Sequence, residues 1–457
     1  MAQGEMDNWF FGIQAGLNFS SGTPEVIAES SINSIEACAS ISDSEGNLLF
    51  YSQGNKVFNR NHDEMLNGNL HGYSRNATQG TGIAPMPGDP DKYYVFSMRY
   101  IGEMYGLDYA IVDMIRDFNR GEVIQRGNFL RDGITEKMTF VQQTDSPNVW
   151  LIVHDFNADE YIVFPISESG IGECTTYATG IIHTERYGYL QPSPDGSMLA
   201  AAVRTGFHSD GFVEISRFDP TEGNISESFV LQMPNRPYGI CFSPDNSKLY
   251  VTSGSPNHLY QFDLSQREPD LIQASRVQIT STPFIDYLGS AAALQLAPNG
   301  KIYLARYETN WLAVINEPNA LGTNCDYVQD AVSLEGTGSC EGGLPNFGNL
   351  FYDQTPAYIL DDPETDEPPI EVEPEYDCEA LLAKPNPTKG ALILESFGDE
   401  ISFVEVYDIT GRVVMPETTY HSAEVRIDEM QHLASGTYIV RVAHGDCLNE
   451  KKVVVAR

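Results

Sequence analysis

The chain has 457 residues, with 27 Lys and Arg against 64 Asp and Glu, which gives a net charge of −37. Nucleic acids and anionic membrane surfaces both bind clustered positive charge, so this composition argues against either partner. The sequence has no run of about 18 apolar residues, and we therefore expect no transmembrane segment. The length exceeds one ordinary core and predicts several domains or a repeat architecture.

The chain begins Met1-Ala2-Gln3-Gly4, without the charged and apolar regions of a secretory signal peptide. This start suits a cytosolic protein, or an exported chain written without its signal. Features near the C-terminus favour the exported chain and an extracellular or outer-membrane location after removal of a signal peptide.

A β-hairpin pattern recurs along the first three quarters of the chain. Its six copies begin at Ala39, Ile83, Thr139, Tyr189, Gly239 and Leu294. In the last three copies Pro-Asp-Gly, Pro-Asp-Asn or Pro-Asn-Gly separates two apolar runs. Proline presets φ for such a turn, and Gly or Asn accepts a positive φ, so each copy predicts a hairpin. The copies begin roughly 45 to 60 residues apart, which is the spacing of four-stranded propeller blades.

A seventh inner strand is predicted at NFGNLFYD, from Asn346, without a partner hairpin. The strand-like segments NWFFG and GLNFS near the N-terminus remain unassigned, and pairing the two ends of the chain would close a ring. We therefore predict an all-β fold that begins with a seven-bladed β-propeller over residues 1–356. A pair of β-sandwiches is the alternative, but it does not explain the repeated turn.

Residues 361–377 contain nine acids, four prolines and no base. Charge repulsion and fixed proline dihedrals keep such a segment extended, so residues 357–377 are predicted to be a linker. Residues 378–457 then show short alternating strands, which predict a small β-sandwich. Within it we expect Gly411 and Gly436 to occupy turns with positive φ.

The C-terminal module resembles the sorting domain of type IX secretion cargo of the Bacteroidota, in its shorter type A form. The residues that carry this resemblance are Pro385, Asn386, Pro387, Gly390, Val406 to Arg412 with Gly411, Leu433, Gly436, Tyr438, Val440, Lys451 and Lys452. The resemblance implies export, handling by the type IX translocon with its shuttle and attachment machinery, and a place outside the cell.

The N-terminal part resembles a propeller group of the same phylum. The matching segments are NWFFGIQAGLNF (8–19), CASISDSEGNLLFYSQG (38–54) and NRNHDEMLNG (59–68). That group is mostly uncharacterised and often carries a type IX tail, so this resemblance supports the fold and export but implies no ligand.

Three arginines, Arg99, Arg204 and Arg306, stand at or just past the end of a hairpin's second strand. Equivalent placement would bring them to one mouth of the channel, where they would bind an anionic sugar or a carboxylate. The alternative is that each pairs with one of the abundant acids. Tyr238 precedes an inner strand and would stack on a sugar, or pack between blades.

For two histidines the sequence allows either a role in a functional site or a structural role. His62 belongs to a polar run, Asn59 to Asp63, which would form a patch near the channel or a loop held by its own hydrogen bonds. His154 and Asp155 end an apolar strand and would suit a general base, but no nucleophile follows at a known spacing. We therefore expect His154 and Asp155 to be hydrogen-bonded core residues.

Seven cysteines are present. In an oxidising compartment two disulfides are expected, Cys325–Cys340 around a short loop and Cys378–Cys447 around the C-terminal module. The sequence has no Cys-x-x-Cys, no His-x-x-x-His and no calcium loop, so neither a metal nor a cofactor is expected.

The main functional hypothesis is a non-enzymatic cell-surface or secreted propeller that binds glycans or proteins, as in adhesion. The alternative is an extracellular polysaccharide hydrolase or lyase, which would need paired carboxylates about 5–10 Å apart at the channel mouth. A cytosolic scaffold would require reduced cysteines and an accidental resemblance of the tail.

Overall fold

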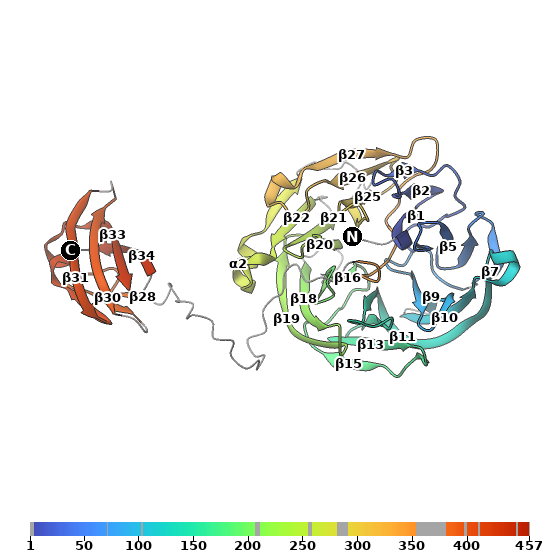
Figure 1. Ribbon diagram of the computed structural model, residues 1–457, viewed down its shortest axis with the longest axis horizontal. Helices are drawn as coiled ribbons and strands as arrows, with labels where there is room; N and C mark the ends of the chain where they lie inside the picture. Colours follow the sequence, from blue (N-terminus) through green and yellow to red (C-terminus); the bar gives the residue numbers. More distant parts are fainter. Residues whose placement is uncertain are drawn as a thin grey trace. The chain divides into compact units, whose positions relative to one another are not determined.

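A computed structural model describes residues 4–70, 72–101, 104–205, 211–254, 258–280, 291–352, 381–396, 400–409, 412–444 and 447–456. The chain divides into two compact units, Met1–Asp361 and Asp362–Arg457 (Figure 1). The predicted linker, residues 357–377, lies outside the described residues. Within the described ranges, no helix is long and apolar enough to cross a membrane.

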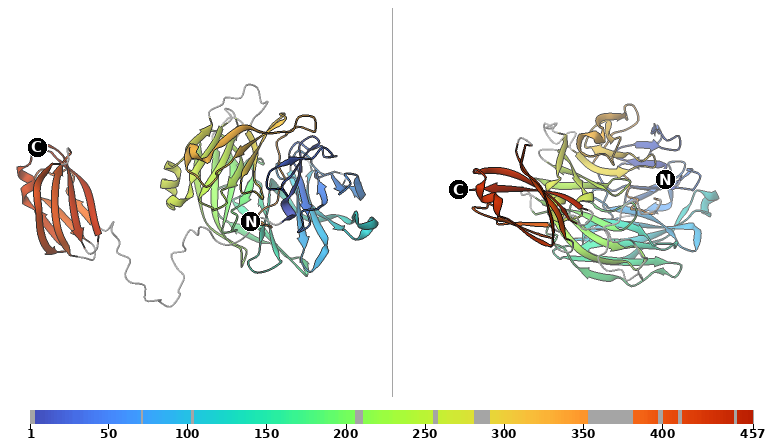
Figure 2. Two further views of the ribbon diagram at one scale, coloured as in Figure 1. Left: turned by 45° about the horizontal axis from the view of Figure 1, so that its top comes forward. Right: turned by 60° about the vertical axis from the view of Figure 1, so that its left-hand side comes forward.

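The first unit is a ring of seven blades, as predicted (Figure 2). Blade 1 contains β1 (Asn8–Phe11), β2 (Ala15–Asn18) and β3 (Glu25–Val26). Blade 2 contains β4 (Ala39–Ser42), β5 (Leu48–Ser52), β6 (Lys56–Asn59) and β7 (Glu64–Asn69). Blade 3 contains β8 (Thr81–Met86), β9 (Asp89–Ile101), β10 (Met104–Asp113) and the first part of β11 (Glu122–Gln142), with α1 (Arg116–Asn119) before β11.

The remaining blades follow in chain order. Blade 4 contains the end of β11, β12 (Val149–Asp155), β13 (Glu160–Ser167), β14 (Gly170–Ile171) and β15 (Thr175–Ala178). Blade 5 contains β16 (Leu190–Pro192), β17 (Met198–Arg204), β18 (Gly211–Asp219) and β19 (Asn224–Met233). Blade 6 contains β20 (Arg236–Phe242), β21 (Lys248–Gly254), β22 (His258–Asp263), α2 (Pro269–Ala274) and β23 (Val277–Thr280). Blade 7 contains β24 (Ala291–Leu296), β25 (Ile302–Arg306), β26 (Trp311–Ile315) and β27 (Tyr327–Ser333).

The strand β11 belongs to two blades. Its first part pairs with β10 as the outer strand of blade 3, and its last residues pair with β12 as the inner strand of blade 4. The chain therefore passes from one blade to the next without a loop at this place.

All six predicted hairpins are present, and the turn chemistry explains them. In the blade 5 turn, Asp195 accepts hydrogen bonds from Ser193 and from the backbone and hydroxyl of Ser197. Gly196 and Asn246 have φ values of 77° and 62°, in the left-handed region that the sequence pattern anticipates. The Asp195 carboxylate therefore stabilises the turn.

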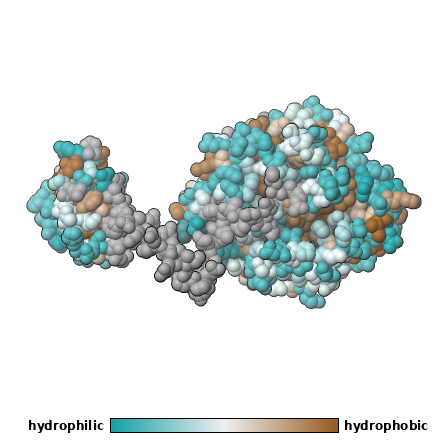
Figure 3. Space-filling model, viewed as in Figure 1, coloured by the Kyte–Doolittle hydropathy of each residue, from teal (hydrophilic) through white to brown (hydrophobic). Residues whose placement is uncertain are grey.

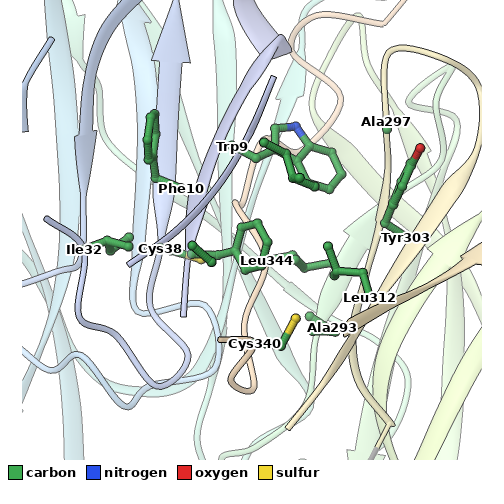
Figure 4. Packing of buried hydrophobic residues seen from close by; sticks show 14 of the residues in the cluster. Trp9, Phe10, Ile32, Cys38, Ala293, Ala297, Tyr303, Leu312, Cys340 and Leu344 are labelled. Carbon is green, nitrogen blue, oxygen red and sulfur yellow. The ribbon is translucent and has the colours of Figure 1, made fainter. Parts of the chain in front are cut away.

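The predicted inner strand from Asn346 was wrong, because residues 346–352 form no strand. The remaining blade is blade 1, which is built from the N-terminal strands β1, β2 and β3. Trp9 of β1 is fully buried and packs against Phe19, Tyr303 and Phe347. Figure 4 shows Trp9 and Leu344 next to the blade 7 side chains. The two ends of the ring are therefore joined by side-chain packing between blades 1 and 7.

Residues 342–352 run through the ring instead of forming a blade. Near the starts of inner strands, the Gly342 carbonyl accepts from the Ala293 N–H, and Asn346 donates its backbone N–H to the Cys38 carbonyl and its side-chain amide to the Met138 carbonyl. Near their ends, Asn349 bonds to Phe140, Gln142 and Pro194, and the Tyr352 hydroxyl donates to Leu296. We call the end where the inner strands begin the mouth. The chain's own backbone fills the channel below it.

The second unit is a seven-stranded sandwich of two sheets. One sheet contains β28 (Leu381–Lys384), β29 (Leu392–Ser396) and β32 (Glu424–Ile427). The other contains β31 (Val413–Ser422), β30 (Ile401–Asp408), β33 (Gly436–His444) and β34 (Cys447–Val455). Gly436 begins β33 without a positive φ, so the predicted turn role was wrong there, because the chain is already extended. Gly411 lies outside the described residues.

The predicted Cys325–Cys340 disulfide is absent, and both residues are free thiols. Cys325 packs in the core between blades 6 and 7, whereas Cys340 belongs to the core around Trp9. The two side chains lie in different cores, so the short separation in sequence was misleading. Cys378 and the side chain of Cys447 are outside the described part of the chain.

Candidate functional site

Five polar side chains from five neighbouring blades gather at the mouth of the propeller. Glu36 precedes β4, Thr78 precedes β8, Glu136 lies in β11, Arg204 ends β17 and Tyr238 lies in β20. We call these residues the mouth cluster. Because inner strands of neighbouring blades begin at the same end of the ring, residues far apart in sequence meet there.

Hydroxyl groups connect the two carboxylates of the mouth cluster. The Tyr238 hydroxyl donates to Glu36 Oε1 and also contacts the Thr78 hydroxyl. Thr78 donates its backbone N–H and its hydroxyl to Glu136 Oε2, each at 2.8 Å. The network therefore links Glu36 to Glu136 through two hydroxyls.

Burial, and after it the nearby Glu136 carboxylate, raise the pKa of Glu36 to about 8, although the Tyr238 hydrogen bond and Arg204 act in the opposite direction. Burial also raises the pKa of Glu136, which the Thr78 hydrogen bonds oppose. At neutral pH Glu36 therefore holds a proton most of the time and acts as a neutral hydrogen-bond donor.

Arg204 lies between two tyrosine rings, with its guanidinium carbon 5.4 Å from the ring centre of Tyr187 and 5.1 Å from that of Tyr238. Its Nε donates to the Pro237 carbonyl at 3.2 Å. Within the described ranges Arg204 has no carboxylate at ion-pair distance, and Tyr187 is 43% exposed. The cation is thus held in place while its terminal nitrogens remain available to a ligand.

The other predicted ligand residues lie elsewhere. Arg99 pairs with Asp108 at 3.4 Å and with Asp132 at 2.6 Å. Arg306 is buried and pairs with Asp330. Of the three arginines, only Arg204 joins the mouth cluster, and it meets the predicted Tyr238 there.

His62 is part of blade 2. Its ring packs on Phe10 and Tyr51, and its Nδ1 lies 3.3 Å from the Tyr51 hydroxyl. Burial lowers its pKa. These contacts describe a loop held by its neighbours, which was the alternative to a binding patch.

A second polar cluster lies between blades 4 and 5 and is fully buried. His154 of β12, His183 and Glu214 of β18 have no exposed surface, and their potential ligand atoms all lie within 4.8 Å of one another. Glu214 accepts hydrogen bonds from the Tyr161 hydroxyl at 2.6 Å and from the Ile181 N–H at 2.7 Å. These three residues are the group in the described structure that could hold a metal.

Of this second cluster, only His154 was considered from the sequence, which predicted a hydrogen-bonded side chain. Asp155 instead pairs with Arg131, and the Nε2 of His154 has no partner among the described residues. His183 and Glu214 carry no sequence signal, because nothing local marks a residue in a loop or a strand that packs against the next blade.

Residues 384–456 match the family described as "Secretion system C-terminal sorting domain". The C-terminal unit is a sorting domain. The match confirms the predicted export tail, and the chain is therefore a secreted or cell-surface protein. Comparison with curated proteins gives no match.

In the sorting domain, the Pro385–Gly390 segment is fastened to the last strand. Asn386 donates to the Lys452 carbonyl at 2.8 Å and accepts from the Val454 N–H at 2.9 Å. The Tyr438 hydroxyl donates to the Ala434 carbonyl at 2.9 Å, while Lys451 lies in the last strand, β34. The Pro385–Gly390 segment and the last strand thus bring the two ends of the sorting domain together.

Three solved structures illustrate the likeness of the fold. A Kuenenia stuttgartiensis hydrazine synthase structure has 14% identity and a TM-score of 0.39, covering 69% of this chain and 96% of that one. The Cps50 β-propeller domain of Myceliophteria thermophila has 10% identity and a TM-score of 0.39, with coverages of 66% and 93%. A putative 6-phosphogluconolactonase from Bacteroides fragilis has 11% identity and a TM-score of 0.36, with coverages of 93% and 100%. These likenesses concern the propeller fold alone.

Proposed function

We propose that this protein is a non-enzymatic binding protein that holds a carboxylate-bearing glycan at the propeller mouth, in the manner of an adhesin. The sorting domain supports delivery outside the cell, and we further propose that the type IX translocon and its attachment machinery recognise this domain. The proposed division is a propeller over 1–356, a linker over 357–377 and the sorting domain over 378–457.

The observation that carries the proposal is that Arg204 is held between two tyrosine rings, with no carboxylate of the described residues at ion-pair distance. A guanidinium stacked between two tyrosines is preorganised for a bidentate bond to a carboxylate. Glu36 is mostly protonated at neutral pH, so it does not cancel this positive charge. The exposed ring of Tyr187 offers a face on which a sugar can stack. On the face drawn in Figure 3, hydrophilic and hydrophobic residues are interspersed over the propeller.

The test is binding of the full chain to an array of neutral and uronic-acid polysaccharides at pH 7. We expect affinity for uronic-acid polymers that falls about tenfold or more in R204Q, because a hydrogen bond to a charged group is lost. The matched control is R116Q, whose arginine pairs with Asp113 in blade 3. Equal binding by R204Q and the wild type would contradict the proposal, as would no binding to any acidic polymer.

The enzymatic alternative has one specific observation in its favour. Glu36, with its raised pKa, has the protonation state of a general acid and lies in one network with Glu136. Incubation of the wild type with the polymer that it binds would separate the two functions. Release of shorter chains that is abolished by E36Q, with binding retained, would identify a hydrolase or lyase. Intact polymer after long incubation supports the binding protein.

A further inference from the structure

The buried cluster of His154, His183 and Glu214 contains nitrogen atoms that the protein leaves without partners. The Nδ1 of His154 lies 2.8 Å from the Asp155 carbonyl, which can only accept, so this nitrogen carries the proton. Its Nε2 therefore presents a lone pair, and no described group donates to it. Both ring nitrogens of His183 are also without partners.

Such orphan atoms are costly when no water can reach them, and buried polar groups are nearly always hydrogen-bonded. Here they converge: the Nε2 of His183 lies 3.7 Å from Glu214 Oε2, too far for a hydrogen bond. Three elements of two blades supply the three side chains. The three side chains thus present two imidazole nitrogens and a carboxylate that one small cation can contact together.

We propose that His154, His183 and Glu214 bind a divalent first-row transition ion of the zinc type, which fastens blade 4 to blade 5. Two neutral imidazoles and one carboxylate are a common donor set for zinc. The surroundings match the support that metal ligands require, since the Asp155 carbonyl fixes the tautomer of His154 and Tyr161 holds the second oxygen of Glu214.

Two charged side chains lie beside the two histidines. Lys137 of β11 is the nearby basic group, and its Nζ donates to the Tyr187 carbonyl at 2.9 Å. Glu214 supplies the carboxylate, and the hydrogen bonds that it accepts from the Tyr161 hydroxyl and the Ile181 N–H favour its charged form.

Binding requires a small rearrangement. The two imidazole rings are stacked, with centroids 3.5 Å apart and planes 6° from parallel. Ligand atoms of a tetrahedral zinc ion lie about 3.4 Å from one another, so the atoms that are now within 4.8 Å must close toward a common centre. His183 lies in an irregular segment between β15 and β16, where its ring can turn more easily than that of His154 in β12.

The experiment measures metal bound to the untagged full chain, refolded with Zn²⁺ or Co²⁺ and then dialysed. We expect about one equivalent per chain, and cobalt d–d absorption bands typical of a nitrogen and oxygen ligand set. H183Q and E214Q should lose both signals, while H258Q, which alters a histidine of blade 6, should retain them. Wild-type protein that binds neither ion, or variants that bind as the wild type does, would overturn the proposal.

A second measurement covers the case in which H183Q fails to fold. Crystals of the wild type grown with Zn²⁺ should show an anomalous peak at the zinc edge between the three side chains. A water molecule could satisfy the same three atoms, and density without an anomalous peak would show a bound water only and would refute the metal site.

Discussion

Replacing Glu36 by Gln should remove a pH-dependent part of the stability of the propeller. The folded-state pKa of Glu36 is about 8, against an ordinary value of 4.5. Between these values the folded protein binds the proton more tightly than the unfolded chain does. The stabilisation from this group is therefore complete below pH 4.5 and is lost as the pH rises to about 8.

The magnitude follows from the size of the shift. Each pKa unit corresponds to about 1.4 kcal/mol, so a fully buried carboxyl would contribute about 5 kcal/mol across this range. Glu36 is only partly buried and solvent screens it, which reduces the expected change to about 2 kcal/mol. Glutamine keeps the shape of the protonated acid but does not titrate.

The assay is urea unfolding of the wild type and E36Q from pH 5 to 8.5, followed by tryptophan fluorescence. The wild type should lose about 2 kcal/mol more than E36Q over this range. Glu214 and Lys137 are common to both proteins and cancel in the difference. Glu136 interacts with Glu36, so the difference reports the two carboxyl groups together. A constant difference between the two profiles would show that Glu36 titrates normally and would refute the reasoning.

Three further predictions concern packing, thiols and delivery. Trp9→Ala should lower the free energy of unfolding by about 3–5 kcal/mol in urea titrations, because it opens the junction of blades 1 and 7; a loss below about 1 kcal/mol would contradict that junction. Peptide mass mapping of the oxidised protein should find Cys325 and Cys340 unlinked, and a peptide joining them would contradict their separate cores. Deletion of residues 378–457 should leave propeller circular dichroism unchanged and abolish surface delivery with periplasmic accumulation; surface display at the wild-type level would show that this unit is not the signal.

The sequence predicted the six hairpins because their geometry is local. Pro-Asp-Gly and its variants determine φ at the turn whatever surrounds them, as Gly196 illustrates. The segment from Asn346 is different, because its apolar residues are compatible with a strand as well as with the irregular segment that they form. Asn349 bonds to residues of two different blades instead of pairing with a single strand, and this arrangement exists only in the closed ring. Closure of a ring is not encoded in any short window of sequence.

The same limit applies to the three arginines. Their positions after the second strand are equivalent in sequence, but their partners come from other strands. Asp108 lies on β10, the strand next to that of Arg99, whereas Asp132 on β11 and Asp330 on β27 each lie two strands away from the arginine that they pair with. Next to Arg204 the fold places two tyrosines instead of an acid, Tyr187 before β16 of blade 5 and Tyr238 in β20 of blade 6. The pattern predicted where the cations stand, but not which of them is neutralised.

The two polar clusters are connected by consecutive residues of β11. Side chains alternate along a strand, so Glu136 points to Thr78 in the mouth cluster and Lys137 points to the buried cluster, where it donates to the Tyr187 carbonyl at 2.9 Å. The ring of Tyr187 in turn packs on Arg204. A substitution in one cluster should therefore alter how much the other cluster contributes to the free energy of unfolding.

A double-mutant cycle with E36Q and H183Q measures this coupling. We expect an interaction energy of about 0.5 kcal/mol or more in urea unfolding at pH 7. The reason is that both replaced residues interact with side chains of β11, and β11 is bonded to the backbone of Tyr187. The control pairs E36Q with H258Q in blade 6, which shares neither and should be additive. Additivity of E36Q and H183Q within about 0.3 kcal/mol would show that β11 is rigid enough to separate the mouth from the buried histidines.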